Sequence, residues 1–378
     1  MRVALQSDQL GFAAPGGIGT YVRGLGAALA ARDDVDLRTF HARLEDWREE
    51  PWMRGRPIVE VPRSVRSLYP LWDAIGRPRL PAAVELADVV HVTNPSGIPG
   101  ARRAPGKALV VTVHDLAFLR YPKAFPPAWR ALYRLGLRAA ARRADVIVVP
   151  SEATAGELRE ATRIAADRIA VTPLAAAPMA SAARPDGGDG GDRLAGATFP
   201  DRYVLAVGTI EPRKNLVRLI RGYRRAIAEG GFPHALVLAG PPGWRADEVL
   251  RELRPGEPGR VVLVGALGAA DLEAAYAGAD VVAYPSLHEG FGLPVLEAMA
   301  RGVPVVASST SSIPEVAGDA ALLVDPRSAD LIGDAIAQVL RDTELAARLV
   351  TAGRARAATF TWEKTAAATV DAYRRALA

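Results

Sequence analysis

Short apolar runs alternate with longer stretches rich in Ala, Leu and Arg along most of the chain. Gly, Pro, Ser or Asn residues bound the short runs, and the longer stretches carry apolar residues at helical spacing. This alternation is typical of buried parallel strands joined by crossover helices. The sequence therefore predicts an α/β fold of doubly wound parallel sheets, whose ligands bind beyond the carboxyl ends of the strands.

The alternating pattern occurs in both halves of the chain. In the first half it predicts strands at 2–5, 35–40, 89–92, 109–113 and 145–149, with helices near 20–31, 127–143 and 154–161. In the second half it predicts strands at 203–207, 235–239, 260–263, 281–284, 303–307 and 321–324, with helices near 216–229, 269–278, 295–301 and 330–339. We therefore expect two Rossmann-like domains, each with its own sheet, that face each other across a cleft.

A polar stretch separates the two halves. Residues 179–200 contain almost no large apolar side chain and repeat Asp-Gly-Gly, so they cannot bury enough surface to fold. We predict a flexible linker there, between a first domain at 1–178 and a second domain at 201–359.

Composition narrows the function classes. The 378 residues include no cysteine, which removes disulfides, Cys-based zinc sites, iron–sulfur clusters and thiol nucleophiles. The first residues lack the features of an export signal and no window reaches about 18 consecutive apolar residues, so we expect a cytoplasmic location. The net charge is 47 − 42 = +5, and because most of the cations are arginines in an Ala-, Pro- and Gly-rich chain, we expect no nucleic-acid partner.

Positive charge concentrates around one predicted helix. Segment 116–144 has seven basic residues and no acid. On helix 127–143 four arginines recur every four residues, namely Arg130, Arg134, Arg138 and Arg142. Two interpretations stay open: peripheral contact with anionic lipid at the inner face of a membrane, or a solvated basic face on a core-packed helix.

The strongest local signal is the segment EGFGLPVLE, which runs from Glu289 to Glu297 and joins a predicted strand to a predicted helix. Gly290 and Gly292 allow backbone N–H groups to approach a ligand, and the helix N-terminus favours an anion such as phosphate. Glu289 would then lie beside the anionic end of the ligand, while Glu297 would accept two hydrogen bonds from a vicinal diol such as that of ribose. The alternative is that both glutamates are only partners of the helix dipole.

A second strand-to-helix junction, GTIEPRKNL at 208–216, presents two adjacent cations. Arg213 offers a planar fork for phosphate oxygens and Lys214 a compact charge, so the pair can neutralise a diphosphate without a metal ion. The alternative is a solvated pair at the start of a helix.

The N-terminal segment GGIGTY at 16–21 also opens a predicted helix. It does not match the dinucleotide-binding fingerprint, because Val22 stands where the third glycine should be. We interpret it as a loop that allows close approach of a phosphate or sugar.

Together these segments resemble the family-four retaining glycosyltransferases of the GT-B fold, and in particular their bacterial mannosyltransferase-like branch. The similar motifs occur in order along nearly the whole chain: GGIGTY at 16–21, VHDLAFLRYP at 113–122, GTIEPRKNL at 208–216, GPPGW at 240–244, SLHEGFGLPVLEAMARGVPVV at 286–306 and SSIPEVAGDAALLVDP at 311–326. The resemblance implies the GT-B architecture and a C-terminal helix, within 360–378, that packs back on the first domain.

The resemblance also implies roles at matched positions. Arg213 and Lys214 would contact the diphosphate of the donor, Glu297 its ribose and Glu289 its sugar. His114 would contact the transferred sugar near its reacting face, with a structural hydrogen bond to Asp115 as the alternative. The other implied donor contacts are Gly16 and Gly17 over the diphosphate, Gly265 and Leu267 around the base, and the backbone of Gly290, Phe291, Gly292 and Leu293.

The implied activity is retaining, metal-independent transfer of a hexosyl unit from a nucleotide-diphosphate sugar to a hydroxyl of a glycan, a glycolipid or a secondary metabolite. The preferred donor is GDP-mannose, and no further cofactor is expected. The departing phosphate oxygen would take the acceptor's proton in a same-face attack. Two alternatives stay open: a sugar-nucleotide epimerase or hydrolase of the same fold, and a two-domain ligand-binding protein without catalytic activity.

Overall fold

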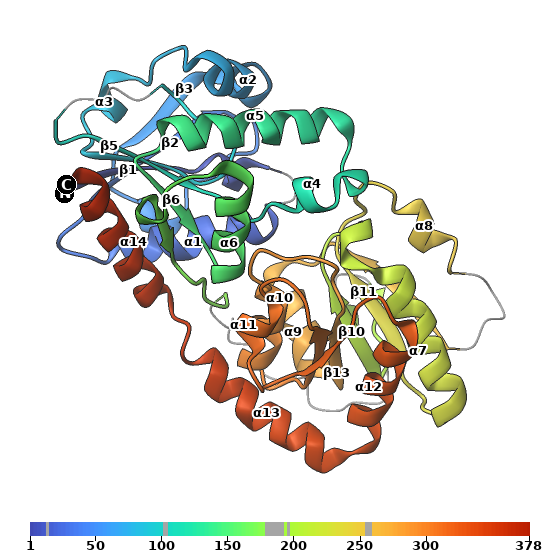
Figure 1. Ribbon diagram of the computed structural model, residues 1–378. Helices are drawn as coiled ribbons and strands as arrows, with labels where there is room; N and C mark the ends of the chain where they lie inside the picture. Colours follow the sequence, from blue (N-terminus) through green and yellow to red (C-terminus); the bar gives the residue numbers. More distant parts are fainter. Residues whose placement is uncertain (13–14, 101–104, 178–192, 195–196, 254–258) are drawn as a thin grey trace. The chain divides into compact units, whose positions relative to one another are not determined.

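The computed structural model describes all residues except 13–14, 101–104, 178–192, 195–196 and 254–258 (Figure 1). The chain forms two compact units, an N-terminal unit of residues 1–175 with 360–378 and a C-terminal unit of residues 176–359. Most of the linker predicted at 179–200 lies outside the described residues. Its described part contains the antiparallel pair β8 (Arg193–Leu194) and β9 (Ala197–Thr198).

The N-terminal unit is built on a parallel sheet of seven strands in the order β3-β2-β1-β4-β5-β6-β7. The strands are β1 (Arg2–Gln6), β2 (Asp36–Arg43), β3 (Ile58–Ser64), β4 (Val89–Val92), β5 (Ala108–Thr112), β6 (Val146–Val149) and β7 (Ile169–Val171). The central strands β4, β5 and β6 are buried along their whole length. Their Val-rich sequences fit this position, because a parallel sheet covered on both faces needs apolar residues on both.

Two groups of helices cover this sheet. The helices are α1 (Gly16–Ala30), α2 (Val65–Ile75), α3 (Ala82–Glu85), α4 (Ala117–Arg120), α5 (Pro127–Arg143), α6 (Glu152–Thr162) and α14 (Trp362–Leu377). Buried side chains of α2, α5 and α6 share one apolar cluster with the sheet. On the other side α1 packs against the C-terminal helix α14, which also contacts β5, β6 and β7 (Figure 1).

The C-terminal unit contains a parallel sheet of six strands in the order β12-β11-β10-β13-β14-β15. The strands are β10 (Tyr203–Val207), β11 (Ala235–Ala239), β12 (Val261–Gly265), β13 (Val281–Tyr284), β14 (Val305–Ser308) and β15 (Leu322–Val324). The helices are α7 (Leu216–Gly230), α8 (Asp247–Leu250), α9 (Ala269–Gly278), α10 (Leu293–Ala300), α11 (Ile313–Ala317), α12 (Ala329–Arg341) and α13 (Thr343–Ala357). Helices α7 and α12 approach closely at Gly222 and Gly333, where an added Cβ would lie 2.3 or 2.4 Å from backbone oxygen of the facing helix.

The predicted α/β class and the two doubly wound sheets are confirmed. The structure adds β3, β7, α2 and α13 to the expected elements, together with the short helices α3, α4, α8 and α11. Strand β3 lies at the sheet edge with several exposed residues, which weakens the apolar pattern of a strand, and α2 contains Pro70, a residue that disfavours the interior of a helix. Among the described residues, no helix combines the length and the apolar character needed to cross a membrane.

The strand order fixes where each sheet can bind a ligand. In the C-terminal unit the direction of winding reverses between β10 and β13, and in the N-terminal unit it reverses between β1 and β4. Loops that leave such a switch point diverge and open a crevice at the carboxyl ends of the strands. In the C-terminal unit these are the loops that carry the Arg-Lys and Glu-Gly-Phe-Gly motifs.

Candidate active site

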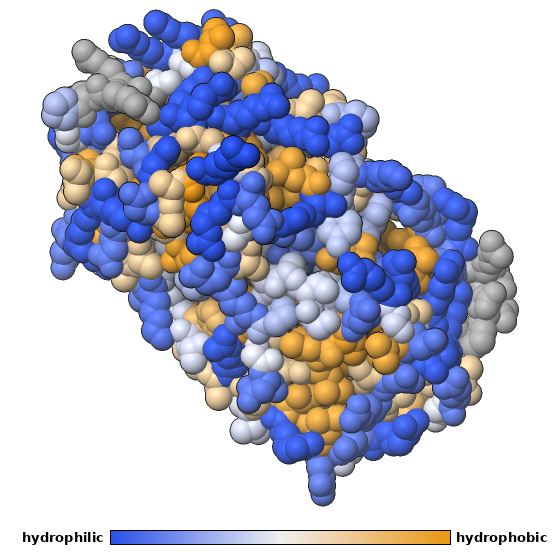
Figure 2. Space-filling model, in the orientation of Figure 1, coloured by the Kyte–Doolittle hydropathy of each residue, from blue (hydrophilic) through white to orange (hydrophobic). Residues whose placement is uncertain are grey.

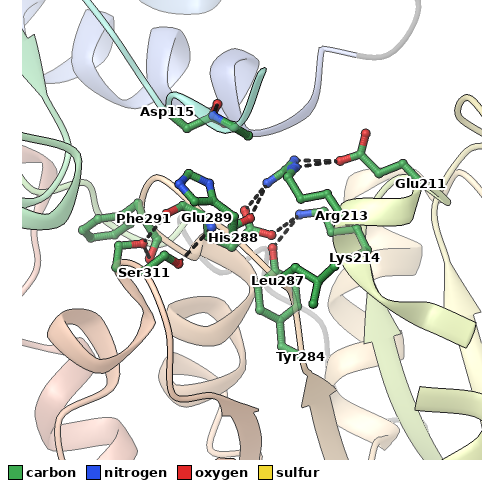
Figure 3. A network of polar contacts seen from close by, with 12 residues as sticks. Asp115, Glu211, Arg213, Lys214, Tyr284, Leu287, His288, Glu289, Phe291 and Ser311 are labelled. Carbon is green, nitrogen blue, oxygen red and sulfur yellow. Dashed lines mark hydrogen bonds and ion pairs between the residues drawn. The ribbon is translucent and has the colours of Figure 1, made fainter. Parts of the chain in front are cut away.

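The centre of the candidate site is a carboxylate held between two cations (Figure 3). Oε2 of Glu289 accepts a hydrogen bond from Nη1 of Arg213 at 2.7 Å, and Oε1 accepts one from Nζ of Lys214, also at 2.7 Å. The side chains of Glu289, Arg213 and Lys214 are 9%, 14% and 11% exposed, respectively. Two motifs 75 residues apart in the sequence thus form one partly buried cluster.

The backbone explains why these side chains meet. The loop after β10 forms a 3-10 turn at Pro212–Lys214, and the loop after β13 runs alongside it, with the N–H of Leu287 donating to the carbonyl of Arg213 at 2.9 Å. Asn215, which has a positive φ of 60°, donates from its side chain to the carbonyl of Pro285 at 3.0 Å. Hydrogen bonds at Arg213 and at Asn215 therefore join the two switch-point loops next to the cations.

Further contacts hold the two cations. Arg213 donates to Oε1 of the buried Glu211 at 2.7 Å and to the carbonyl of His288 at 3.0 Å. Lys214 donates to the hydroxyl of Tyr284 at 2.7 Å and lies 4.9 Å from the centre of its ring. The formal charge of the two cations and two glutamates is 2 − 2 = 0. The cluster is therefore neutral as it stands, unlike the solvated cation pair considered as the alternative.

The charge state of Glu289 follows from this setting. Burial by itself disfavours the ionised carboxylate, but the attraction of Arg213 and Lys214 outweighs burial. The pKa of Glu289 therefore lies well below its usual range. This glutamate is an anion at neutral pH, and it occupies the position where two cations converge.

The loop from Glu289 to Leu293 is fixed by backbone contacts. The N–H of Glu289 donates to Oγ of Ser311 at 3.0 Å, and Oγ of Ser312 lies 2.9 Å from the carbonyl oxygens of both Glu289 and Phe291. Gly292 precedes α10 with a φ of 108°, and an added Cβ would lie 2.5 Å from Ile313. Only glycine therefore fits at this position.

The second acid of the motif belongs to a separate network. Glu297 lies on α10 with 8% exposure, and its Oε2 accepts a hydrogen bond from the hydroxyl of Tyr276 at 2.9 Å. Arg301 stacks 5.1 Å from the Tyr276 ring and donates to Glu273 at 2.5 Å. Burial raises the pKa of Glu297, with Tyr276 and Arg301 partly opposing the shift. Among the described residues, no partner hydrogen-bonds to Oε1 of Glu297.

His114 lies in the N-terminal unit, just after β5. Its Nε2 lies 2.8 Å from the carbonyl oxygen of Thr93, and its ring meets Tyr21 edge-on at 4.9 Å. Because a carbonyl only accepts, Nε2 carries the proton and Nδ1 keeps its lone pair. Burial lowers the pKa of His114. In the described contacts Asp115 accepts instead from the N–H of Ala117, at 3.0 Å, so the alternative of a His114–Asp115 hydrogen bond does not hold.

The remaining predicted residues lie at the ends of elements. Helix α1 begins at Gly16, which has a φ of 56°, and Gly17 follows it in the N-terminal unit. Gly265 ends the edge strand β12 with a φ of 72°, and Leu267 follows it. The structure thus brings together Arg213, Lys214 and Glu289. Gly16, Gly17 and His114 belong to the other unit, and each unit is described by itself.

Several polar residues of the site were not anticipated, and three of them contact the predicted residues directly through their side chains. Glu211 and Tyr284 hold the cations, and Tyr276 holds Glu297. Glu211 lies inside the GTIEPRKNL motif, and Tyr284 ends β13 two residues before the motif that begins at Ser286. Tyr276 comes from a helix whose sequence carries no chemical motif, and only the tertiary structure identifies it.

Among the described residues, no group of three or more His, Asp or Glu side chains is arranged to hold a metal ion. The polar groups that converge at the switch point are guanidinium, ammonium and carboxylate groups. Such an arrangement can bind an anion with two phosphate groups and can place a carboxylate beside it.

Comparison with known proteins agrees with this geometry. The family described as "Glycosyl transferases group 1" matches residues 197–356, and that described as "Glycosyltransferase Family 4" matches residues 15–176. The chain belongs to the family-four glycosyltransferases. The first match covers most of the C-terminal unit, including both of its switch-point motifs, and the second covers most of the N-terminal unit.

Individual relatives differ in their described substrates. The chain is 42% identical to the O-antigen chain mannosyltransferase B of Escherichia coli over 46% of its own length and 45% of that relative, so the match spans less than half of the relative. It resembles the sucrose-phosphate synthase structure from Thermosynechococcus elongatus with a TM-score of 0.70 and 25% identity, over 99% of this chain and 98% of that one. It shares its fold with HepE of Anabaena, solved in complex with UDP-glucose, with a TM-score of 0.68 and 18% identity over 98% of each chain.

Proposed function

We propose that this chain is a retaining hexosyltransferase that moves a sugar from a nucleotide-diphosphate donor to a hydroxyl acceptor. The observation that carries the proposal is the convergence of Arg213 and Lys214 on one carboxylate at the switch point of the C-terminal sheet. A diphosphate presents the same kind of paired anionic oxygens to a guanidinium fork and an ammonium group. Family membership supports the same class of reaction.

In this proposal the donor changes the pairing at the centre of the cluster. The four charged side chains sum to zero, so a diphosphate does not enter an excess of positive charge. Its oxygens instead take over hydrogen bonds that Glu289 accepts from Arg213 and Lys214. The released carboxylate of Glu289 then turns toward the sugar, whose hydroxyls can donate to it.

The transfer step needs one leaving group and one proton acceptor. The bond between the anomeric carbon and the phosphate oxygen breaks, and a bond from that carbon to the acceptor oxygen forms on the same face. The departing phosphate oxygen takes the acceptor's proton, and Arg213 and Lys214 neutralise the diphosphate that leaves. These two cations supply the charge stabilisation, so the proposed reaction is independent of a metal ion.

Other residues contribute to donor binding in this proposal. Glu297, with Oε2 tied to Tyr276, offers Oε1 to the ribose diol. The backbone of Gly290, Phe291, Gly292 and Leu293, at the start of α10, favours phosphate and sugar oxygens. We further propose that Gly16 and Gly17 contact the diphosphate and that Gly265 and Leu267 contact the base. His114 would accept a hydrogen bond from a hydroxyl of the transferred sugar through the lone pair on Nδ1.

We propose mannose from GDP-mannose as the first donor to test, with a polysaccharide hydroxyl as acceptor. The support is the mannosyltransferase relative from Escherichia coli. A UDP-sugar is the second choice, because the structurally similar HepE binds UDP-glucose. We also propose peripheral contact of α5 with an anionic membrane, supported by the 53% exposure of Trp129 near its start.

The test is a product assay with GDP-mannose or UDP-glucose, with and without mannose-containing oligosaccharide acceptors. Transfer predicts a glycosylated acceptor in amounts equal to the nucleoside diphosphate released. An altered sugar nucleotide or free sugar without acceptor would favour the epimerase or hydrolase. Binding without any turnover of either donor would favour the ligand-binding protein. The double variant Arg213→Ala/Lys214→Ala serves as the inactive control.

A further inference from the structure

A network of buried side chains runs through the N-terminal unit and ends at His114. The hydroxyl of Tyr373, on α14, lies 2.7 Å from Nδ1 of His91, and Nε2 of His91 lies 2.7 Å from Oγ1 of Thr112. The same Oγ1 lies 2.9 Å from the hydroxyl of Tyr21, on α1. The ring of Tyr21 then meets the ring of His114 edge-on, with an angle of 80° between the two ring planes.

This Tyr21 network, made of Tyr21, Thr112, His91 and Tyr373, is withdrawn from solvent. Three of its members have no exposed surface, and Thr112 is 1% exposed. Figure 2, in the orientation of Figure 1, shows hydrophilic residues where α14 meets the solvent, so the network occupies the inner side of that helix. Buried polar groups are costly unless they are hydrogen-bonded, and here every member has a partner.

The network is paired without carrying a charge. Burial lowers the pKa of His91 to about 3, so its imidazole is neutral at pH 7 and has one N–H and one lone pair. One of its two hydroxyl neighbours therefore donates to the ring, and the other accepts from it. A neutral network of this kind adds no charge to the field at His114, and its effect there is to fix positions.

His114 needs such support, because its own hydrogen bond leaves its ring free to turn. Nε2 lies 2.8 Å from the carbonyl oxygen of Thr93, and the ring joins the backbone through Cγ. These two atoms lie on opposite sides of the imidazole, so the ring plane can rotate about the axis between them. The rotation keeps the hydrogen bond and changes the direction of Nδ1. The ring of Tyr21 stands across the imidazole plane, with the two centroids 4.9 Å apart, and blocks this rotation.

The same tyrosine connects two parts of the proposed site. Tyr21 lies in α1, the helix that begins at Gly16. Thr112 is the last residue of β5, and His114 follows it in the next loop. The hydrogen bond between Tyr21 and Thr112 therefore fixes the first turns of α1 relative to the loop that carries His114.

We propose that Tyr21 is a positioning residue for His114, and that the hydrogen bonds through Thr112 and His91 to Tyr373 hold Tyr21 in place. Tyr21 acts through His114 and not on the donor itself. It keeps the lone pair on Nδ1 directed at the sugar hydroxyl that donates to it. This inference rests on the proposed function for the ligand of His114, but the state of the imidazole can be measured without turnover.

The first arm of the test is an NMR titration of the His114 imidazole in the full chain without ligand. Burial lowers the pKa of His114 in wild type, while Thr93 and Asp115 act in the opposite direction. Tyr21→Leu removes the ring beside the imidazole and admits water, so the pKa of His114 should move up toward its ordinary value of about 6.5. Tyr21→Phe keeps the ring but loses the bond to Thr112, and it should give a smaller shift in the same direction.

The second arm compares turnover with nucleotide binding. Tyr21→Leu should lower kcat by about tenfold or more, because a misdirected contact to the reacting sugar slows the transfer. Its calorimetric affinity for nucleoside diphosphate should stay within about twofold of wild type, since that ligand lacks the sugar. Tyr21→Phe should lose about threefold in kcat. The matched control is Tyr203→Phe, which removes another buried tyrosine hydroxyl, bonded to the carbonyl of Ala275 in the C-terminal unit.

The two arms give separate decisions. An unshifted titration of His114 in Tyr21→Leu overturns the proposal, and so does wild-type kcat in that variant. Equal losses of kcat in Tyr21→Phe and Tyr203→Phe would also overturn it, because the effect would then be one of general stability. If circular dichroism shows that Tyr21→Leu is unfolded, the comparison of Tyr21→Phe with Tyr203→Phe decides. If His114 shifts as expected but wild type transfers no sugar, the proposed function fails and the positioning of His114 stands.

Discussion

Oε1 of Glu289 lies 2.7 Å from Nζ of Lys214, while its other oxygen lies 2.7 Å from Arg213. One carboxylate therefore engages both of the cations expected to bind a diphosphate. Because the cluster is neutral with Glu211 included, its charge is balanced before any ligand arrives. A ligand that binds there must compete with an intramolecular anion, and this competition makes the site testable residue by residue.

Replacing Lys214 by Ala should abolish most of the stabilisation by nucleoside diphosphate. A ligand at 100 times its dissociation constant stabilises the folded state by about 2.7 kcal/mol, which raises the midpoint by several degrees in units of this size. Loss of a charged hydrogen bond to phosphate costs about 1.5–3 kcal/mol of affinity. Thermal unfolding with GDP, UDP, ADP and TDP measures this effect. The control is Lys364→Ala, which replaces an exposed lysine of α14. If the nucleotide raises the unfolding midpoint equally in wild type, Lys214→Ala and Lys364→Ala, Lys214 is excluded from the site.

Replacing Glu289 by Gln should separate binding from turnover. The substitution removes the anion that competes for Arg213 and Lys214, so the affinity for nucleoside diphosphate should stay equal or rise. Turnover should fall by about tenfold or more, because a carboxylate directed at the transferred sugar is lost. The measurement is calorimetric affinity beside the initial rate. Weaker nucleotide binding with wild-type turnover would contradict the proposed role.

Replacing Glu297 by Gln should change the discrimination between ribose and 2′-deoxyribose. A carboxylate that accepts from a vicinal diol loses one of its two hydrogen bonds with a deoxynucleotide, at a cost of about 1.5–3 kcal/mol. Wild type should therefore prefer the ribonucleotide, and Glu297→Gln should lose most of that preference. Glu273→Gln tests whether the effect is local, since Glu273 pairs with Arg301 and is not a proposed ligand residue. Equal preference in wild type and Glu297→Gln would leave Glu297 a structural residue.

The buried His91 should make stability depend on pH. Its two ring nitrogens each lie 2.7 Å from a hydroxyl, of Tyr373 and Thr112, and burial lowers its pKa to about 3. The unfolded state takes up a proton near pH 6.5 and the native state does not, so stability falls as the pH falls from about 6.5 toward 3. The slope for one such group is at most about 1.4 kcal/mol per pH unit. Denaturant unfolding across this pH range should show a smaller pH dependence of the unfolding free energy for His91→Asn. A His91 imidazole that titrates near pH 6.5 by NMR would contradict the lowered pKa.

Two helical glycines should respond oppositely to Ala. In α1 a Cβ on Gly24 would lie 2.1 Å from the ring of Trp362, so Gly24→Ala should destabilise by about 1–3 kcal/mol despite its better helix propensity. In α6 the nearest atom to a Cβ on Gly156 is a flexible arginine nitrogen at 3.9 Å, so Gly156→Ala should stabilise by roughly 0.5–1 kcal/mol. The measurement is the thermal unfolding midpoint of each variant compared with that of wild type. A neutral Gly24→Ala would mean that α14 does not pack on α1 as described.

The alternation of apolar runs with helical stretches determined the α/β class and most of the strands, because a strand covered on both faces must be apolar throughout. The motifs determined which residue types stand at the carboxyl ends of β10 and β13. The local sequence provided no indication of the role of Tyr276, whose hydroxyl donates a hydrogen bond to Glu297, 21 residues further along the chain. A contact of that kind depends on how two helices pack, and periodicity records only which face of each helix is apolar.

The sequence by itself determined that two cations and two glutamates stand at or just after two predicted strand-to-helix junctions. Only the tertiary structure decided that Glu289, rather than solvent, faces Arg213 and Lys214, and that the pKa of its carboxyl is lowered in spite of burial. The physical reason is that a pKa and an ion pair depend on distances between atoms from different loops. Those distances are fixed by strand order, which places β10 beside β13 although about 75 residues separate them.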